Sequence, residues 1–513
     1  MSRSPVPVIW SIAGTDSGGG AGLAADQRAA DAFGVHLCPV VAAVTAQHSH
    51  AVMHVEPVPP ELIDAQLAAL ADDMPPAAIK TGLLGGAAQI AAVARAVDRL
   101  RERYGVLPLV VDPVLGASSG ASFADDATLR AYRELLLPRA TLITPNRREA
   151  AVLVGRDDAV PALARALRGP SRAVCTTGGD ADETLAIDWL GTDHAEGWLA
   201  LPRVATHHSH GTGCTFATSA AAALALGFVA ADALVLAKMA TTHALRHARA
   251  AGAGPGPVIA HEGFANDASL LPQMSFGEAL PRFDFAPRAP APPIGLYAIV
   301  SRTEQIAPVL AAGARTVQLR IKTPASPDAG WRDSLRAALA DAHASCRAAG
   351  ATLIVNDHHE IALELGAALH LGQEDLLALG EAGRARLIES GIALGISSHS
   401  LWELARSRSL APAYVACGPV WPTLTKVMPW RQQGEGNLAW WCAMAGVPVV
   451  AIGGILSGGQ VTTAARCGAD GVCLVRVLGD DPITTLPPLA AALAEGRMLP
   501  RLPVPALPHP SLG

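Results

Sequence analysis

Residues 294–497 alternate between short apolar runs and longer Ala-rich stretches, and this alternation constrains the fold more than any other feature of the chain. Eight of the apolar runs are rich in residues that favour strands, and a gap of helical length follows most of them. A strand–helix unit repeated eight times is typical of a (β/α)8 TIM barrel. We expect the strands at residues 296–300, 316–322, 352–357, 368–372, 393–399, 414–420, 448–455 and 471–475.

The chain has 513 residues, which is more than one hydrophobic core usually supports. Residues 275–293 include a Pro-rich run that cannot lie inside a helix or a sheet. We therefore predict a linker here, between one domain at residues 1–274 and the barrel at residues 294–497. A second Pro-rich stretch, residues 498–513, predicts a disordered tail.

The first domain also alternates between strand-like and helical segments, and its strand-like runs are apolar throughout, as in a buried parallel sheet. These runs are residues 8–14, 37–44, 78–82, 109–113, 141–145 and 173–177. Residues 183–190 and 196–204 follow as a pair with a short polar connection, which predicts an antiparallel edge. The whole pattern is α/β and predicts a three-layer α/β/α sandwich.

Composition excludes several classes of protein. The net charge is −6 and no polybasic run is present, so we expect no nucleic-acid partner. The eight cysteines form no Cys-x-x-Cys pair, which favours reduced thiols in the cytoplasm. The N-terminus shows no signal-peptide pattern. The apolar run Cys214–Ala231 carries hydroxyl residues and ends at Asp232, so we expect a buried helix and no membrane association.

Polar residues follow the expected barrel strands, where barrel enzymes gather their catalytic groups. Gln318, Arg320 and Lys322 alternate along one strand, so we expect all three to face the barrel mouth. Asp357 and Asp375 follow the next two strands and could together hold Mg²⁺ through carboxylate oxygens. Gly453-Gly454 and the turn after the last strand occupy the position where barrels often bind phosphate.

Five motifs, in this order, resemble those of thiamine-phosphate synthases over nearly the whole second domain. They are Gln318-Leu-Arg-Ile-Lys322, Asn356-Asp357, His370-Leu-Gly-Gln-Glu-Asp375, Gly418-Pro-Val-Trp-Pro-Thr-Leu-Thr-Lys426 and Ala451-Ile-Gly-Gly-Ile455. The resemblance implies that the diphosphate of hydroxymethylpyrimidine loses its diphosphate group and that thiazole phosphate captures the resulting cation. It also implies Mg²⁺ as a cofactor, held by Asp357 and Asp375.

The same resemblance implies a role for each strand end. The pyrimidine diphosphate would bind through Gln318, Arg320, Lys322, Asn356 and Lys426, with Ser397 beside the pyrimidine ring. The thiazole phosphate would bind at Thr423, Thr425, Gly454, Val475 and Arg476. Arg476 departs from the family, which usually has Ser there. We expect the Arg476 side chain either to reinforce the phosphate site or to turn outward.

In the first domain, Gly211-Thr212-Gly213 precedes Cys214 and a long Ala-rich helix. Such a turn presents free N–H groups to an anion at the positive end of the helix. Three further motifs accompany it: Gly14–Asp26, Val111-Asp112-Pro113 and Thr144–Glu149. Together they resemble the hydroxymethylpyrimidine/phosphomethylpyrimidine kinase branch of the ribokinase-like fold, over about residues 6–250.

This second resemblance implies ATP as a co-substrate. Asp26 and Gln47 would bind the pyrimidine, in a pocket lined by Gly14 and Ala21. Asp112 and Glu149 would organise Mg²⁺ and water, Asn146 would lie by the ATP phosphates, and Gly211, Thr212 and Gly213 would form the anion hole. Cys214 would be the catalytic base, because a helix N-terminus can lower a thiol pKa. Alternatively, Cys214 is only a small residue at the helix start.

Three departures from the kinase family leave alternatives open. Thr177 stands where the family has Lys before Gly-Gly, a second common Lys is missing near Ser118, and Leu83 replaces a Met. The kinase half could be degenerate, or could act on another pyrimidine or on pyridoxal. The whole chain could also be a non-catalytic sensor. We expect both activities, small-molecule substrates and a homo-oligomer. The histidine groups at residues 48–54, 207–210 and 358–359 are expected to be mostly surface or loop residues.

Overall fold

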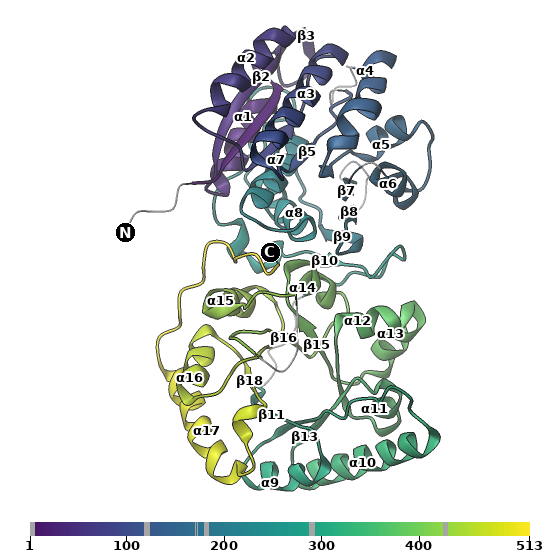
Figure 1. Cartoon of the computed structure of the whole chain (residues 1–513), viewed down its shortest axis with the longest axis vertical. Helices are drawn as coiled ribbons and strands as arrows, with labels where there is room; N and C mark the ends of the chain where they lie inside the picture. The colour runs from purple at the N-terminus through teal and green to yellow at the C-terminus, as the bar shows by residue number, and fades with distance from the viewer. Residues whose placement is uncertain are drawn as a thin grey trace. The chain divides into compact units, whose positions relative to one another are not determined.

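The computed structural model describes residues 6–512 except 117–123, 170, 172, 179–183, 287–292 and 424–428. The chain forms two compact units, Met1–Phe283 and Asp284–Gly513 (Figure 1). The first unit extends beyond residue 274, where we predicted its end. Ser275 accounts for part of this difference, since its backbone N–H donates to the Trp198 carbonyl at 2.9 Å and so continues the sheet edge.

The first unit is built on one ten-stranded sheet with the strand order β10-β9-β8-β7-β6-β5-β4-β1-β2-β3. Its strands are β1 (Val8–Gly14), β2 (His36–Gln47), β3 (Val52–Pro57), β4 (Ala78–Thr81), β5 (Leu109–Val111), β6 (Leu142–Ile143), β7 (Ala173–Thr176), β8 (Leu185–Gly191), β9 (Glu196–Pro202) and β10 (Gln273–Met274). The six central strands β1, β2 and β4–β7 are parallel, and β8–β9 form the predicted antiparallel edge. The sequence did not reveal β3, an antiparallel strand at the other edge, or the short β10.

Helices cover both faces of this sheet, which confirms the three-layer sandwich. Helices α1 (Gly22–Ala32), α7 (Thr212–Ala225) and α8 (Ala230–Arg246) form one layer. The other layer holds α2 (Pro60–Ala71), α3 (Ala87–Tyr104), α4 (Asp126–Ala131), α5 (Arg147–Val154) and α6 (Val160–Arg168). The apolar run Cys214–Ala231 is divided between α7 and α8, and among the described residues no helix is long and apolar enough to cross a membrane.

The second unit is a closed barrel of eight parallel strands, as the alternation predicts. The strands are β11 (Gly295–Val300), β12 (Thr316–Leu319), β13 (Thr352–Asn356), β14 (Ala368–Leu371), β15 (Leu394–Ser398), β16 (Tyr414–Cys417), β17 (Val449–Ala451) and β18 (Gly471–Leu474). The helices are α9 (Ile306–Ala311), α10 (Ala329–Ala348), α11 (His359–Leu365), α12 (Gln373–Ala378), α13 (Gly380–Ser390), α14 (Leu401–Arg408), α15 (Gly434–Met444), α16 (Gly458–Cys467) and α17 (Pro482–Met498). Strand β12 ends at Leu319, so Arg320 and Lys322 lie beyond it and the predicted alternation of three side chains along one strand is wrong.

The Pro-rich stretch after α17 is ordered over its described residues, so the predicted disordered tail is wrong. The Leu502 N–H donates to the Arg466 carbonyl at 2.9 Å, and the His509 N–H donates to Oδ1 of Asn437 at 2.8 Å. The Arg431 N–H donates to the carbonyl of Ser511, which is buried. The prolines prevent regular helix or sheet hydrogen bonding in this stretch, and these bonds satisfy its backbone groups instead. They attach the tail to α15 and α16.

Candidate active sites

The centre of the first unit is an ion pair that has no contact with solvent. Nζ of Lys80, on β4, lies 2.8 Å from the carboxylate of Asp26, on α1, and neither side chain is exposed. Ser11 Oγ donates to the same carboxylate at 2.6 Å, and Thr218 Oγ1, from α7, donates at 2.7 Å. The carboxylate of Asp26 thus already accepts bonds from three side chains, and its contact with the pyrimidine stays a prediction.

Lys80 also acts on two other predicted catalytic residues. Burial alone would lower the pKa of Lys80, but Asp26, Cys214 and Asp112 together raise it, so the ammonium group stays charged. Burial raises the pKa of Asp112 to about 6; Lys80 opposes this rise and Asp26 adds to it. The sequence analysis missed Lys80, although a Lys within an otherwise apolar strand is itself a signal of a buried partner.

Cys214 lies in the first turn of α7, as expected, but its thiol is not activated. Burial raises the pKa of Cys214 to about 12; Lys80 opposes this rise, while Asp26 and Asp112 add to it. A hydrogen bond from the backbone of Gly22 lowers the pKa only slightly. The prediction of a lowered pKa is therefore wrong, because burial, with Asp26 and Asp112 adding to it, raises the pKa of this thiol.

The predicted anion hole lies at the start of α7. Gly211 has a φ of 88°, and a Cβ there would lie 2.2 Å from the carbonyl oxygen of Gly20. Only glycine fits this close approach. A Cβ at Gly213 would meet nothing within 4 Å, so space is open beside this residue. Thr212 is half-buried between them. The positions of the three residues agree with an anion site at a helix N-terminus.

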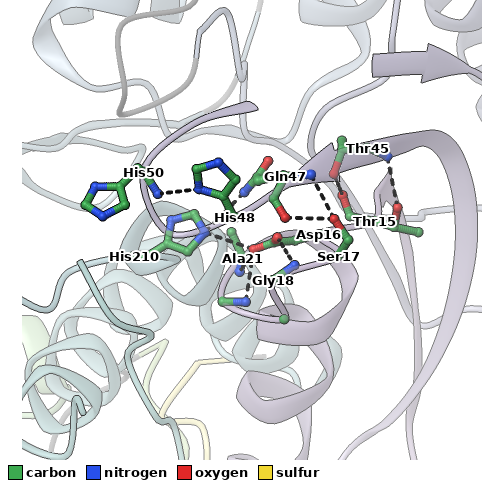
Figure 2. A network of polar contacts seen from close by, with 12 residues as sticks. Thr15, Asp16, Ser17, Gly18, Ala21, Thr45, Gln47, His48, His50 and His210 are labelled. Atoms are coloured by element: carbon green, nitrogen blue, oxygen red, sulfur yellow. Dashed lines mark hydrogen bonds and ion pairs between the residues drawn. The ribbon is translucent and has the colours of Figure 1, made fainter. Parts of the chain in front are cut away.

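An unpredicted pair, Asp16 and His210, joins the loop after β1 to the loop before α7 (Figure 2). Nε2 of His210 lies 2.8 Å from Oδ2 of Asp16, which also accepts from the backbone N–H of Gly20 and Ala21. Although burial would raise the pKa of Asp16, the bond from His210 and the backbone bonds from Ala21 and Gly18 lower it to about 2. The histidines near His210 were expected to be mostly surface or loop residues, and His210 does lie in a loop; its position directly before the Gly-Thr-Gly turn was the signal of its contact with Asp16.

The predicted pyrimidine pocket is gathered around this pair. Nε2 of Gln47 lies 3.2 Å from Nε2 of His210, and the backbone of Gln47 is held by Ser17 Oγ at 2.8 Å (Figure 2). Gly14 ends β1, and a Cβ there would lie 3.2 Å from Cδ2 of Leu83. Ala21 caps the N-terminus of α1. The carboxyl ends of β1, β2 and β4 thus hold these pocket residues together.

Asn146 and Glu149 have a structural task at the start of α5. Oδ1 of Asn146 accepts from the Glu149 N–H, and Oε2 of Glu149 accepts from the Asn146 N–H, both at 2.9 Å. This is a capping box, which satisfies two backbone donors of the first turn. Asn146 also pairs with Thr177 as an isolated bridge, so both residues lie where β6 and β7 end. Contact with ATP or Mg²⁺ therefore stays a prediction for Asn146 and Glu149.

Inside the barrel, a chain of hydrogen bonds connects Gln318 to Ser397. Nε2 of Gln318 donates to the Tyr297 hydroxyl at 2.7 Å, which lies 2.8 Å from the Tyr414 hydroxyl. The Tyr414 hydroxyl lies 2.9 Å from Nδ1 of His370, and Nε2 of His370 lies 3.0 Å from Ser397 Oγ. The two tyrosines belong to none of the five motifs, and His370 belongs to one of them but was assigned no role.

The donors and acceptors in this series of hydrogen bonds fix the direction in which each bond is donated, from Gln318 toward Ser397. An amide NH₂ only donates, so each tyrosine hydroxyl passes its own proton onward until Nδ1 of His370 accepts. Burial, with Arg320 and His399 adding to it, lowers the pKa of His370 to about 4, so the ring is neutral and carries one N–H, at Nε2. This N–H donates to Ser397, and the Ser397 hydroxyl keeps its proton for a ligand.

The two carboxylates predicted to hold Mg²⁺ interact through their charges. Burial raises the pKa of Asp357, Asp375 raises it further, and Arg320 opposes the rise. Asp357 has a φ of 65°, an unusual backbone conformation for Asp that occurs often at ligand sites. Two repelling carboxylates at neighbouring strand ends are a donor set that suits Mg²⁺. Lys322 is exposed in the loop beyond them.

The predicted thiazole-phosphate residues lie around β17 and β18. Gly454 has a φ of 74°, and a Cβ there would lie 2.6 Å from the backbone of Trp421, so a side chain would not fit. Val475 and Arg476 are exposed in the turn after β18. Thr423 is half-buried. Asn356, which was predicted to bind the pyrimidine diphosphate, ends β13 and is buried. Thr425 and Lys426 lie outside the described residues.

Comparison with known proteins identifies both units. A family model described as phosphomethylpyrimidine kinase matches residues 16–259, and one described as thiamine monophosphate synthase matches residues 296–478. A probable chloroplastic thiamine biosynthetic bifunctional enzyme of Oryza sativa subsp. japonica is 32% identical over 93% of this chain and 87% of its own length. The chain belongs to the family of bifunctional thiamine biosynthetic enzymes.

Two other relatives agree with this assignment. A chloroplastic thiamine biosynthetic bifunctional enzyme of Arabidopsis thaliana is 32% identical over 93% of this chain and 90% of its own length. A hydroxymethylpyrimidine/phosphomethylpyrimidine kinase of Synechococcus elongatus is 39% identical over 49% of this chain and 97% of its own length. The ribokinase-like sandwich and the TIM barrel are thus the kinase and synthase units of a bifunctional enzyme, as both resemblances implied.

Proposed function

We propose that the first unit uses ATP to phosphorylate hydroxymethylpyrimidine and then its monophosphate. The observation that carries the proposal is the assembly of Lys80, Asp112 and Cys214 beside the open N-terminus of α7. The N–H groups of Gly211 and Gly213 would stabilise the charge on the phosphate being transferred.

Asp112 is the proposed acceptor of the substrate hydroxyl proton. Its pKa of about 6 lies near the working pH, where a carboxylate base is effective. Cys214, with a pKa of about 12, keeps its proton and would serve as a small, neutral group beside the substrate. Gln47, held next to His210, would recognise the pyrimidine ring. Asp26 acts through Lys80, whose charge it balances.

We propose that the second unit joins the pyrimidine diphosphate to thiazole phosphate. Arg320 and Lys322 would bind the diphosphate, and the hydroxyl of Ser397 would donate to the pyrimidine. Asp357 and Asp375 would hold Mg²⁺, which supplies charge neutralisation for a departing diphosphate. The backbone at Gly454 and the turn at Val475 and Arg476 would bind the thiazole phosphate.

We further propose that the protein is cytoplasmic and forms a homo-oligomer. Each of the eight cysteines is a free thiol, which supports a reducing compartment such as the cytoplasm. Strand β3 is an edge strand whose Met53 side chain is 70% exposed. Exposed edges of this kind favour pairing with a second copy, which supports a homo-oligomer.

The proposal is tested by supplying each unit with its own substrates. ADP release is measured with hydroxymethylpyrimidine, its monophosphate or pyridoxal, and thiamine phosphate is measured from the diphosphate, thiazole phosphate and Mg²⁺. We expect ADP from both pyrimidines and thiamine phosphate from the second assay.

Other outcomes separate the alternatives. ADP release with pyridoxal alone would assign the first unit to another substrate. Binding of thiazole phosphate without any product in either assay would make the protein a sensor. Asp112→Asn should strongly reduce only the first activity and Asp375→Asn only the second, so each variant is the control for the other.

A further inference from the structure

Three histidines outside both candidate active sites lie together in the first unit. His243 and His247 are one turn apart at the end of α8, and His261 comes from the segment that follows. One ring nitrogen from each histidine lies within 4.8 Å of those of the other two. The ring centroids are 4.1–4.4 Å apart, so the three imidazoles are in mutual contact.

Backbone carbonyls fix the tautomers of two of these rings. Nδ1 of His247 lies 2.9 Å from the His243 carbonyl oxygen, and Nδ1 of His261 lies 2.9 Å from the Glu262 carbonyl oxygen. A carbonyl oxygen only accepts, so each Nδ1 carries the proton and each Nε2 keeps a lone pair. Metal-binding histidines show this arrangement, in which the second ring nitrogen donates to a carbonyl or a carboxylate.

The burial and bonding of His243 provide an independent sign of a ligand site. Its side chain is nine-tenths buried and packs against both other rings. In the part of the chain that the structure describes, its buried Nδ1 has no hydrogen-bond partner. Buried polar nitrogens are rarely left in this state, because burial removes the water that would otherwise bind them.

We propose that His243, His247 and His261 bind a divalent transition-metal ion of the Zn²⁺ type, with a fourth position open to water. Imidazole ligands select such ions, and two histidines at positions i and i+4 of a helix can reach one ion. Zn–N bonds of about 2.0–2.1 Å place tetrahedral ligand atoms roughly 3.3 Å apart. His247 and His261 are exposed, so small shifts of both rings toward His243 can close the remaining distance.

The surrounding charges do not oppose a cation strongly. Arg246 is the neighbouring positive group, and its Nη1 lies 2.8 Å from the carboxylate of Asp267. Asp267 also acts on His243 with its negative charge. The pair therefore neutralises most of the repulsion that Arg246 alone would exert on the ion.

The position of the cluster gives the metal a structural task. The segment before His261 is held to α8 by a bond from the Ile259 N–H to the Ala244 carbonyl, at 3.1 Å. The same segment holds His210, since Val258 N–H donates to the His210 carbonyl at 3.0 Å and His210 N–H donates to Gly256 at 3.1 Å. The ion thus fastens to α8 the segment that positions His210.

The test uses the full chain, stripped of metal with a chelator and kept in excess Mg²⁺ so that the carboxylate sites are saturated. Zn²⁺ is added, unbound ion is removed, and bound zinc and the melting temperature are measured. The variant is His247→Ala/His261→Ala, which keeps the fold because both side chains are exposed. The matched control is His36→Ala/His54→Ala, which removes two other exposed histidines.

We expect the wild type and the control to retain one more equivalent of zinc than the cluster variant. Zinc should raise the melting temperature of the wild type and the control only, since a ligand stabilises the state that binds it. Equal zinc retention in the wild type and the cluster variant would overturn the proposal. An equal loss of zinc in the control would overturn it as well.

Discussion

Lys80 and Asp26 form an ion pair at 2.8 Å in which neither side chain is exposed. Asp26 comes from the Gly-rich motif of the sequence, whereas Lys80 comes from an apolar strand, and the pair joins α1 to β4. Because Lys80 also acts on Asp112 and Cys214, the charge balance of the kinase site depends on this contact. The Gly-rich motif thus contributes to the site indirectly, because its Asp26 is the counter-charge of Lys80.

Lys80→Met should destabilise the first unit by about 3–5 kcal/mol, because it leaves the carboxylate of Asp26 buried without a counter-charge. Urea unfolding of the first unit, followed by near-UV circular dichroism, measures the change. The control is Arg99→Met, which breaks an exposed ion pair with Asp64 and should cost at most about 1 kcal/mol. Equal losses in the two variants would contradict a buried, uncompensated charge.

Asp16→Asn should lower stability by about 2 kcal/mol at pH 7, and this difference should disappear in acid. The folded-state pKa of Asp16 is about 2, below its ordinary value of 3.8, so ionised Asp16 stabilises the fold above pH 4. That contribution is lost as the pH falls from about 4 through 2. Unfolding free energies measured from pH 7 downward test this. The exposed residue Asp73 is the control, since Asp73→Asn should give a small difference at every pH.

Asp112→Asn should reduce kinase kcat/KM about 10²–10³-fold, the usual contribution of a proton acceptor. Cys214→Ser should retain activity within about tenfold, since a thiol with a pKa of about 12 does not take the proton. Steady-state ADP release with hydroxymethylpyrimidine measures both. If Cys214→Ser lost as much activity as Asp112→Asn, the thiol and not the carboxylate would be the base.

Tyr414→Phe should lower synthase kcat/KM about three- to tenfold, because it removes the hydroxyl that bonds to both Tyr297 and His370 in the series of hydrogen bonds that orients Ser397. Ser397→Ala should lose a similar factor. In the double variant the two losses should not multiply, because Tyr414 acts through His370 on Ser397 itself. Kinase activity of the same proteins serves as the control. Fully multiplied losses would show that Tyr414 acts independently of Ser397.

Local patterns predicted the elements of this fold but not its long-range contacts. All eight barrel strands and the central strands of the sandwich were visible as apolar runs, because burial on both faces requires such runs. The bond between Tyr297 and Tyr414 joins residues 117 positions apart, and the local sequence carries no trace of it. Strand β3 was missed because its exposed side chains give no apolar run.

Site residues were predicted where a motif contains them, but their long-range connections were not. Gln318 and Ser397 were assigned roles from the resemblance, and the structure connects them through Tyr297 and Tyr414, which no motif included, and through His370, which a motif included without a role. Burial raises the pKa of Cys214, and Asp26 and Asp112, which are distant in the chain, add to the rise, so the helix position alone gave the wrong direction. The Pro-rich tail is ordered by Asn437 on α15, a partner that composition cannot reveal.

We propose above all that one chain carries both the kinase and the synthase activity. The most direct measurement is thiamine phosphate formed from hydroxymethylpyrimidine, ATP, Mg²⁺ and thiazole phosphate. The wild type should form it, Asp112→Asn should form it only when the pyrimidine diphosphate is supplied, and Asp375→Asn should accumulate that diphosphate. A wild-type protein that forms thiamine phosphate only from supplied diphosphate would contradict the account.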